Sequence, residues 1–142
     1  MNDPYNLQRF VHGQEGVFAT ALAELRSGRK QNHWMWFIFP QLAALGRSPA
    51  AQYYGITSRE EAGAYLAHPL LGPRLREAIE ALLPWAAKRS PEEILGGIDA
   101  LKLRSSLTLF DAVEPAAIFG RALGALYDGP DERTLALLAQ DD

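Results

Sequence analysis

Apolar residues recur at the three- and four-residue spacing of amphipathic helices along most of the chain. The apolar stripe over residues 11–25 predicts a first helix, which Gly13 and Gly16 weaken at its start and Gly28 ends. Further helices are predicted from Ser58 (with Glu61 in a capping-box pattern) to about Ala67, from Leu71 to Leu82, from Ser90 onward, from about Ile98 to Val113, from Ala116 to Tyr127 and after Asp131.

One short segment fits both a helix and a strand. Residues 34–39 form an apolar run, and such a run is typical of a buried strand as well as of a buried helix. Elsewhere clean alternation is missing, valine is scarce, and no Asn-Gly or Asp-Gly turn joins two apolar runs. A single strand would have no pairing partner, so we predict a helix. The expected fold is all-α, a single globular domain over residues 1–142 with roughly seven or eight short helices.

The composition is that of an ordinary globular domain. With 142 residues, 48% of them apolar and 22% charged, the chain is long enough to bury a core without a covalent or metal staple. It has no cysteine, which excludes disulfides, thiolate zinc sites, iron–sulfur clusters and cysteine nucleophiles. The net charge of −3 and the isoelectric point of about 5.6 argue against a non-specific binder of nucleic acids or membrane surfaces.

The start of the chain indicates a compartment. Met1 to Pro4 lack the basic and apolar stretches of a secretory signal. The longest apolar run, residues 34–39, is far shorter than the ~20 residues of a membrane helix. We therefore expect a soluble, cytoplasmic protein with no membrane partner.

The most unusual segment is residues 28–41. It holds two of the three tryptophans, Trp34 and Trp36, close to Arg29, Lys30 and His33. A run that is apolar all round must be buried, so these basic residues lie where the chain enters the core. Cations beside aromatic faces suit a planar, negatively charged ligand. In the alternative interpretation, the aromatic residues only fill the core and the cations only complement a helix C-terminus.

A second segment carries a charge on an otherwise apolar helix. At about 100° per residue, Asp99, Lys102 and Ser106 form a polar stripe between two apolar arcs. Because an enclosed charge must be paired or hydrogen-bonded, Lys102 is the strongest ionisable candidate in the chain. The alternative is an ordinary i, i+3 ion pair with Asp99 that satisfies both groups. One arc consists of Ile98, Leu101 and Leu109, and the other of Leu103, Leu107 and Phe110.

Other chemistry is sparse. The three histidines lack the i, i+4 pairing of metal ligands, so no metal site is predicted. The sequence contains no nucleophile elbow, Walker loop, dinucleotide-binding glycine fingerprint or His-Glu-x-x-His motif, and no cofactor is predicted. Ser105 and Ser106 have no histidine nearby in the sequence, so a serine nucleophile would depend on contacts made in the fold.

The same two segments resemble a known family. The resemblance is carried by Gly28-Arg29-Lys30-x-x-His33-Trp34-Met35-Trp36-Phe37-x-Phe39-Pro40-Gln41-Leu42, by Glu61-Ala62-x-x-Tyr65-Leu66-x-His68-Pro69 and by Asp99-x-x-Lys102-Leu-x-Ser105-Ser106-x-Thr108-Leu109-Phe110. These strings are similar to those of the bacterial domain of unknown function 1810, the Rv1873-like group. Gly13 departs from the pattern, since relatives usually have alanine there. The resemblance implies one mainly helical domain over nearly the whole chain and supplies no activity.

We expect the two segments to converge on a pocket for a small anionic metabolite, with a nucleotide or an ADP-ribose-like compound as the candidate class. In this hypothesis the ligand-binding residues are Arg29, Lys30, Trp34, Trp36, Gln41, Ser105 and Ser106, and the catalytic residues are His33 and Lys102. Arg29 and Lys30 hold a phosphate, Trp34 or Trp36 stacks on a ring, and any proton transfer falls to the two catalytic residues.

The alternative hypothesis is a non-enzymatic protein-interaction module. In that case the polar residues form internal networks that fix helix packing, and the surface shows an apolar patch and no convergent pocket. A nucleic-acid partner ranks third, because Arg26, Arg29 and Lys30 form only a small basic spot. The sequence gives no indication of the oligomeric state.

Overall fold

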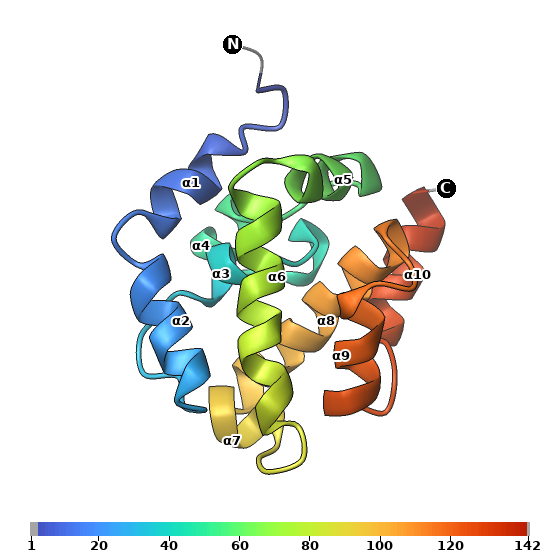
Figure 1. The fold of residues 1–142 in the computed structure, drawn as a ribbon. Helices are drawn as coiled ribbons and strands as arrows, with labels where there is room; N and C mark the ends of the chain where they lie inside the picture. The colour runs from blue at the N-terminus through green and yellow to red at the C-terminus, as the bar shows by residue number, and fades with distance from the viewer. Residues whose placement is uncertain (1–2, 142) are drawn as a thin grey trace.

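The computed structural model describes residues 3–141, with residue 141 described by its backbone alone. Ten α-helices and two 3-10 turns make up this part of the chain (Figure 1). The helices are α1 (Gln8–Gln14), α2 (Phe18–Arg26), α3 (Met35–Ile38), α4 (Pro49–Tyr53), α5 (Arg59–Ala67), α6 (Leu71–Leu82), α7 (Pro91–Leu95), α8 (Gly97–Val113), α9 (Ile118–Leu126) and α10 (Glu132–Asp141), and the 3-10 turns are η1 (Ala43–Leu45) and η2 (Leu83–Trp85).

The all-α prediction is confirmed. Residues 3–141 contain no strand, and the backbone pairs in β fashion only at an isolated bridge between Leu42 and Ile56. The segment 34–39 forms the four-residue helix α3, as predicted. The predicted first helix is divided into α1 and α2, because Gly16 between them takes a φ of +68° that no α-helix continues through. The helix α4 was not predicted, although Ser48 caps it by accepting a hydrogen bond from the Ala51 amide.

Two of the predicted helix starts have different outcomes. At α7, Ser90 and Glu93 form the full reciprocal capping box. At α5, Ser58 accepts from the Glu61 amide, but the Glu61 carboxylate turns away to Arg9 and Thr57. Glu61 is almost fully buried, and its Oε2 lies 2.7 Å from Arg9 Nη2. The same serine–glutamate spacing therefore starts a helix in both places, but at α5 the glutamate forms a buried ion pair in place of the reciprocal cap.

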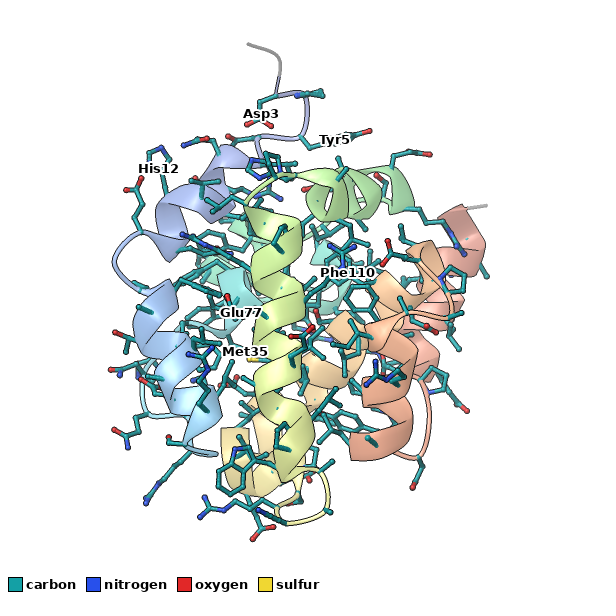
Figure 2. All side chains as sticks on the ribbon, viewed as in Figure 1. Asp3, Tyr5, His12, Met35, Glu77 and Phe110 are labelled. Atoms are coloured by element: carbon teal, nitrogen blue, oxygen red, sulfur yellow. The ribbon has the colours of Figure 1, made fainter. Side chains whose placement is uncertain are left out.

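Helices α6 and α8 contribute the largest numbers of buried residues to the core. Figure 1 shows α6 running along the front of the molecule, with α1 and α2 on one side, α9 and α10 on the other, and α8 behind it. Helix α8 packs against α5, α7, α9 and α10. An aromatic chain crosses the interior, from Phe10 through Tyr65 (5.0 Å between ring centres) to Phe110 (5.4 Å). Figure 2 shows Phe110 among the helices, with His12 and Tyr5 toward the periphery.

The two apolar arcs of α8 are buried to different extents. Leu103, Leu107 and Phe110 of one arc are buried, whereas Ile98 and Leu101 of the other arc are 74% and 66% exposed. Of that second arc only Leu109 enters the core. The first two turns of α8 therefore present a mixed surface of exposed aliphatic residues and half-buried Asp99 and Lys102.

Within residues 3–141 no helix has the length and apolar character needed to cross a membrane. Met1 and Asn2, which contributed to the expectation about the compartment, lie outside the described residues.

Candidate functional site

The loop between α2 and α3 is held by one buried carboxylate, Glu24. Its Oε1 accepts hydrogen bonds from the amides of Gln31 (2.6 Å) and Asn32 (3.0 Å) and from Trp34 Nε1 (3.0 Å), and its Oε2 accepts from Asn32 Nδ2 (2.6 Å). Burial alone would raise the pKa of Glu24, but these four hydrogen bonds outweigh it and lower the pKa to about 2. The carboxylate therefore stays ionised and fixes the loop that carries Lys30 and His33.

The loop is tied to the rest of the fold at two further points. Gly28, with a φ of +74°, turns the chain after α2 and lies so close to Trp85 that an added Cβ would be 2.6 Å from the indole ring. Two residues later, the Lys30 amide donates to the Ile94 carbonyl of α7 at 2.7 Å. These contacts bring the Lys30 side chain to the start of α8.

Asp99 is shared between two lysines. Its Oδ2 lies 2.9 Å from Lys30 Nζ, and its Oδ1 lies 3.5 Å from Lys102 Nζ. The Lys30 side chain is 8% exposed and that of Lys102 is 23% exposed. Each ammonium group also faces an indole ring: Lys30 Nζ is 5.1 Å from the ring centre of Trp34, and Lys102 Nζ is 5.1 Å from that of Trp36. Two cations, one carboxylate and two indoles thus form one cluster.

This cluster borders an open pocket of about 410 Å³, which we call the lysine pocket. Its chemistry comes from Lys30, His33, Trp36, Asp99 and Lys102. Its rim is shaped by Gly96, whose φ of +91° turns the chain from α7 into α8. The other lining residues are Met35, Leu95, Gly97 and Ile98. The pocket combines a surplus of one positive charge with an exposed imidazole and an aromatic wall.

A second pocket, of about 360 Å³, lies on the other side of Lys102, and we call it the arginine pocket. It shares Ile98 and Lys102 with the lysine pocket and adds Arg47 and Arg133. Its remaining lining residues are Gln41, Leu45, Gly46, Ser48, Ala51, Leu101, Ser105 and Asp131. The side chain that was predicted as the strongest ionisable candidate therefore stands between two pockets.

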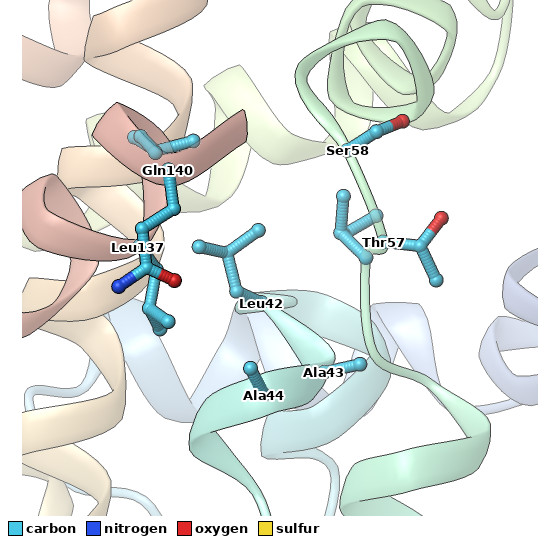
Figure 3. Close-up of a pocket in the computed structure, with 9 residues that line it drawn as sticks. Leu42, Ala43, Ala44, Thr57, Ser58, Leu137 and Gln140 are labelled. Atoms are coloured by element: carbon cyan, nitrogen blue, oxygen red, sulfur yellow. The ribbon is translucent and has the colours of Figure 1, made fainter. Parts of the chain in front are cut away.

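A further pocket, of about 380 Å³, contains none of the predicted site residues. Figure 3 shows Leu137 and Gln140 of α10 facing, across this space, the segment that carries Thr57 and Ser58, with Leu42 between them. None of its lining residues is charged. It offers apolar surface without groups for acid–base or ionic chemistry, so we place no candidate site there.

Metal ligands do not gather in the described part of the chain. Residues 3–141 contain no group of three or more histidine, aspartate or glutamate side chains close enough to hold an ion. The two candidate pockets offer ammonium, guanidinium, imidazole, carboxylate, hydroxyl and amide groups.

Comparisons with known proteins identify the family. The sequence profile described as "Protein of unknown function (DUF1810)" matches residues 4–138. The chain belongs to this family. The crystal structure of the conserved hypothetical protein Rv1873 from Mycobacterium tuberculosis is similar, with a TM-score of 0.93 and 52% sequence identity over 96% of this chain and 99% of that chain. No curated protein matches the chain. The resemblance seen in the sequence is thereby confirmed.

The DUF1810 segments that were singled out from the sequence do meet in the fold. The predicted residues that line one or both pockets are Lys30, His33, Trp36, Gln41, Lys102 and Ser105. The i, i+3 ion pair of Lys102 with Asp99, the alternative interpretation of the stripe, is also present, at 3.5 Å. Lys102 therefore forms an ion pair within α8 and also lines a pocket.

Three predicted residues lie elsewhere. Arg29 is exposed but does not line either pocket. Trp34 is fully buried, with its indole N–H donated to Glu24, so its ring faces packed side chains and Lys30. Ser106 is buried away from both pockets, and its Oγ makes no hydrogen bond with any described residue. We leave these three out of the candidate site.

Sequence reasoning missed Glu24 and the two arginines. Glu24 occupies the apolar stripe of α2, between buried Leu22 and Leu25, and a carboxylate in such a position is a signal of an enclosed, hydrogen-bonded acid. Arg47 and Arg133 carry no comparable signal, because they belong to separate polar segments that only the fold brings to one pocket.

Proposed function

We propose that this protein binds a small anionic ligand in the lysine pocket. The observation that carries the proposal is the shared carboxylate: Asp99 lies within 3.5 Å of both Lys30 and Lys102, so one negative charge faces two positive ones. The whole chain has a net charge of −3, so this local surplus of positive charge runs against the composition. An incoming phosphate or carboxylate would complete the charge balance of the cluster.

The roles of the residues follow from their exposure. Lys30 is nearly buried and lies 2.9 Å from Asp99, so it mainly holds the Asp99 carboxylate and adds positive electrostatic potential to the pocket. Lys102 is more exposed and more loosely paired, at 3.5 Å, so it is the cation that contacts the ligand. Trp36 supplies the aromatic wall. If the ligand is turned over, the exposed His33 imidazole and the Lys102 ammonium group are the proton-transfer groups of this pocket.

The candidate class of ligand is a nucleotide or an ADP-ribose-like compound. Such a molecule joins phosphate groups, which suit Lys102, to a planar base, which suits Trp36. The support for this class is the pairing of cationic and aromatic groups around a pocket of about 410 Å³, which is within the usual range for small-molecule sites.

A non-enzymatic protein-interaction module is the second candidate. The exposed Ile98 and Leu101 favour it, because they are neighbours at i, i+3 on one helix and form a continuous apolar surface of the kind that a protein partner covers. The Lys30–Asp99–Lys102 cluster would then serve only to fix α7, α8 and the preceding loop. This candidate predicts that no anionic small molecule binds at the pocket.

Binding measurements with charged and neutral probes separate the two candidates. Isothermal titration calorimetry and thermal-shift assays would compare ADP and ADP-ribose with adenosine, which has no phosphate. We expect both anionic probes to bind more tightly than adenosine, with an affinity that decreases as salt is added. Lys102→Met removes the charge while keeping an unbranched side chain only one atom shorter, and we expect it to weaken binding of ADP roughly tenfold.

The matched control is Lys88→Met. Lys88 also lies over an indole, 5.8 Å from the ring centre of Trp85, but it lines neither the lysine pocket nor the arginine pocket. This variant should bind ADP as the unaltered protein does. The proposal fails if neither anionic probe binds the folded protein, or if Lys102→Met and Lys88→Met have equal effects.

A further inference from the structure

The arginine pocket contains basic groups that the proposed function does not use. Arg47 lies in the loop before α4, and Arg133 lies in the first turn of α10. Neither forms an ion pair with any residue in the range 3–141, whereas Arg9, Arg26 and Arg76 each pair with a glutamate. Two guanidinium groups from different elements therefore line one pocket without a partner.

The one carboxylate in this pocket is already engaged. Asp131 Oδ2 accepts hydrogen bonds from the Thr134 amide (2.9 Å), from Thr134 Oγ1 (2.5 Å) and from Ser105 Oγ (3.3 Å). It thus caps the start of α10, and it does not form a salt bridge with Arg133 or Arg47. With Lys102 added, the pocket holds three cations against one carboxylate.

The position of Arg133 is unfavourable for the helix itself. A helix N-terminus carries a partial positive charge, so an arginine in the first turn of α10 is repelled by the helix dipole. The cap residue Asp131 and Glu132 in the same turn carry the negative charge that this end of a helix favours, but neither forms an ion pair with Arg133. An anion bound between Arg133 and Arg47 would give both guanidinium groups a direct partner.

The two pockets adjoin each other and share two lining residues. Ile98 and Lys102, one turn apart on α8, line both of them, so a molecule that contacts Lys102 can extend to either side. Beside the shared Lys102, Ile98 is 74% exposed, and Leu101, which lines the arginine pocket alone, is 66% exposed. Cations in both pockets next to this aliphatic surface match a ligand with two anionic groups on an apolar or ring-shaped centre.

We propose that the arginine pocket is a second anion subsite, in which Arg47 and Arg133 bind a phosphoryl group of a ligand whose other anionic group lies at Lys102. This inference rests on the proposed function and narrows it, because it assigns the ligand to the small molecules that carry two separated anionic groups. The planar guanidinium groups suit the fork-like hydrogen bonding of a phosphoryl group better than an ammonium group does.

The test compares two probes that differ by one phosphate, adenosine 5′-monophosphate and adenosine 3′,5′-bisphosphate. Calorimetry on the unaltered protein should show tighter binding of the bisphosphate, by roughly tenfold for the additional charge-assisted contacts. The double variant Arg47→Gln/Arg133→Gln should bind both probes with nearly equal affinity, at the level of the monophosphate. Both positions are exposed, so the variant should remain folded, which its thermal unfolding would verify.

The matched control is Arg121→Gln, at an exposed arginine of α9 that lines neither pocket. It should leave the preference for the bisphosphate intact. If the monophosphate binds but the bisphosphate gains nothing, or if the gain survives in the double variant, the second subsite is refuted and the proposed function stands. If neither probe binds, both are overturned.

Discussion

Glu24 connects a local feature of the sequence to the geometry of the candidate site. In Glu24→Gln the side chain keeps its size but loses its charge, and one of its two acceptor oxygens becomes an N–H₂ donor. That group then faces the donors of Asn32, Gln31 or Trp34, which now surround the carboxylate. We expect the variant to be destabilised and the loop before α3 to be the region that loosens.

The magnitude follows from the pKa. Burial opposes ionisation, yet the surrounding hydrogen bonds lower the pKa of Glu24 from 4.5 to about 2 in the folded protein. Because the folded-state pKa is lowered, this contribution is fully present above the unfolded-state pKa and is lost as the pH falls toward the folded-state value. The difference between the two pKa values corresponds to about 3 kcal/mol at neutral pH, and less than half of that remains at about pH 3.

Urea unfolding at a series of pH values, followed by tryptophan fluorescence, measures this effect. The free energy of unfolding of Glu24→Gln should be about 3 kcal/mol below that of the unaltered protein near neutral pH, and the gap should narrow below about pH 4.5. Glu77→Gln is the control, because Glu77 forms only an exposed ion pair with Arg26, at 3.5 Å, and should change stability by less than about 0.5 kcal/mol. A gap that stays constant with pH, or one below about 1 kcal/mol, would refute this reasoning.

Three further substitutions test other parts of the fold by thermal or urea unfolding. Arg9→Met leaves the buried carboxylate of Glu61 without its 2.7 Å partner and should cost about 3–5 kcal/mol; a loss typical of a surface pair would contradict the structure. In Gly28→Ala the alanine must adopt a φ of +74° and its Cβ must push against Trp85, so the free energy of unfolding should fall by at least about 1–2 kcal/mol. A neutral result would mean that the chain does not take this conformation at residue 28. Ser106→Ala removes a buried hydroxyl that has no hydrogen-bond partner among residues 3–141, so it should be neutral or stabilising and leave ADP binding unchanged; a marked loss of either would show an unrecognised role for Ser106.

The sequence was informative wherever a signal is local. The helical spacing of apolar residues located α6 and α8, because a helix buries one face regardless of what covers it. Ser90, Pro91 and the two acids after them marked the start of α7, because the signals of a helix start lie within one turn of the chain. The division of the first helix at Gly16 was less evident, since a glycine weakens a helix without fixing its own φ.

The sequence showed which residues are unusual, but it did not show which of them are buried or which residues they contact. The segment of Trp34 and Trp36 reads as one aromatic string, yet the fold buries the first and leaves the second at a pocket. Neighbours in a short helix point in different directions, and which direction is covered depends on elements far along the chain. Lys102 was singled out from its stripe. The contact of its partner Asp99 with Lys30, however, depends on the loop that Glu24 holds.

By itself the sequence determined the helical fold class, the family signature and the two segments that contain the unusual charges and rings. Only the tertiary structure decided that Asp99 is shared by two lysines, that Ile98 and Leu101 remain exposed, and that Arg47 and Arg133 meet beside Lys102. The physical reason is the distance along the chain over which each effect acts. Periodicity and capping act within a few residues, whereas the charge balance of a pocket is a sum over side chains that packing brings together from distant parts of the chain.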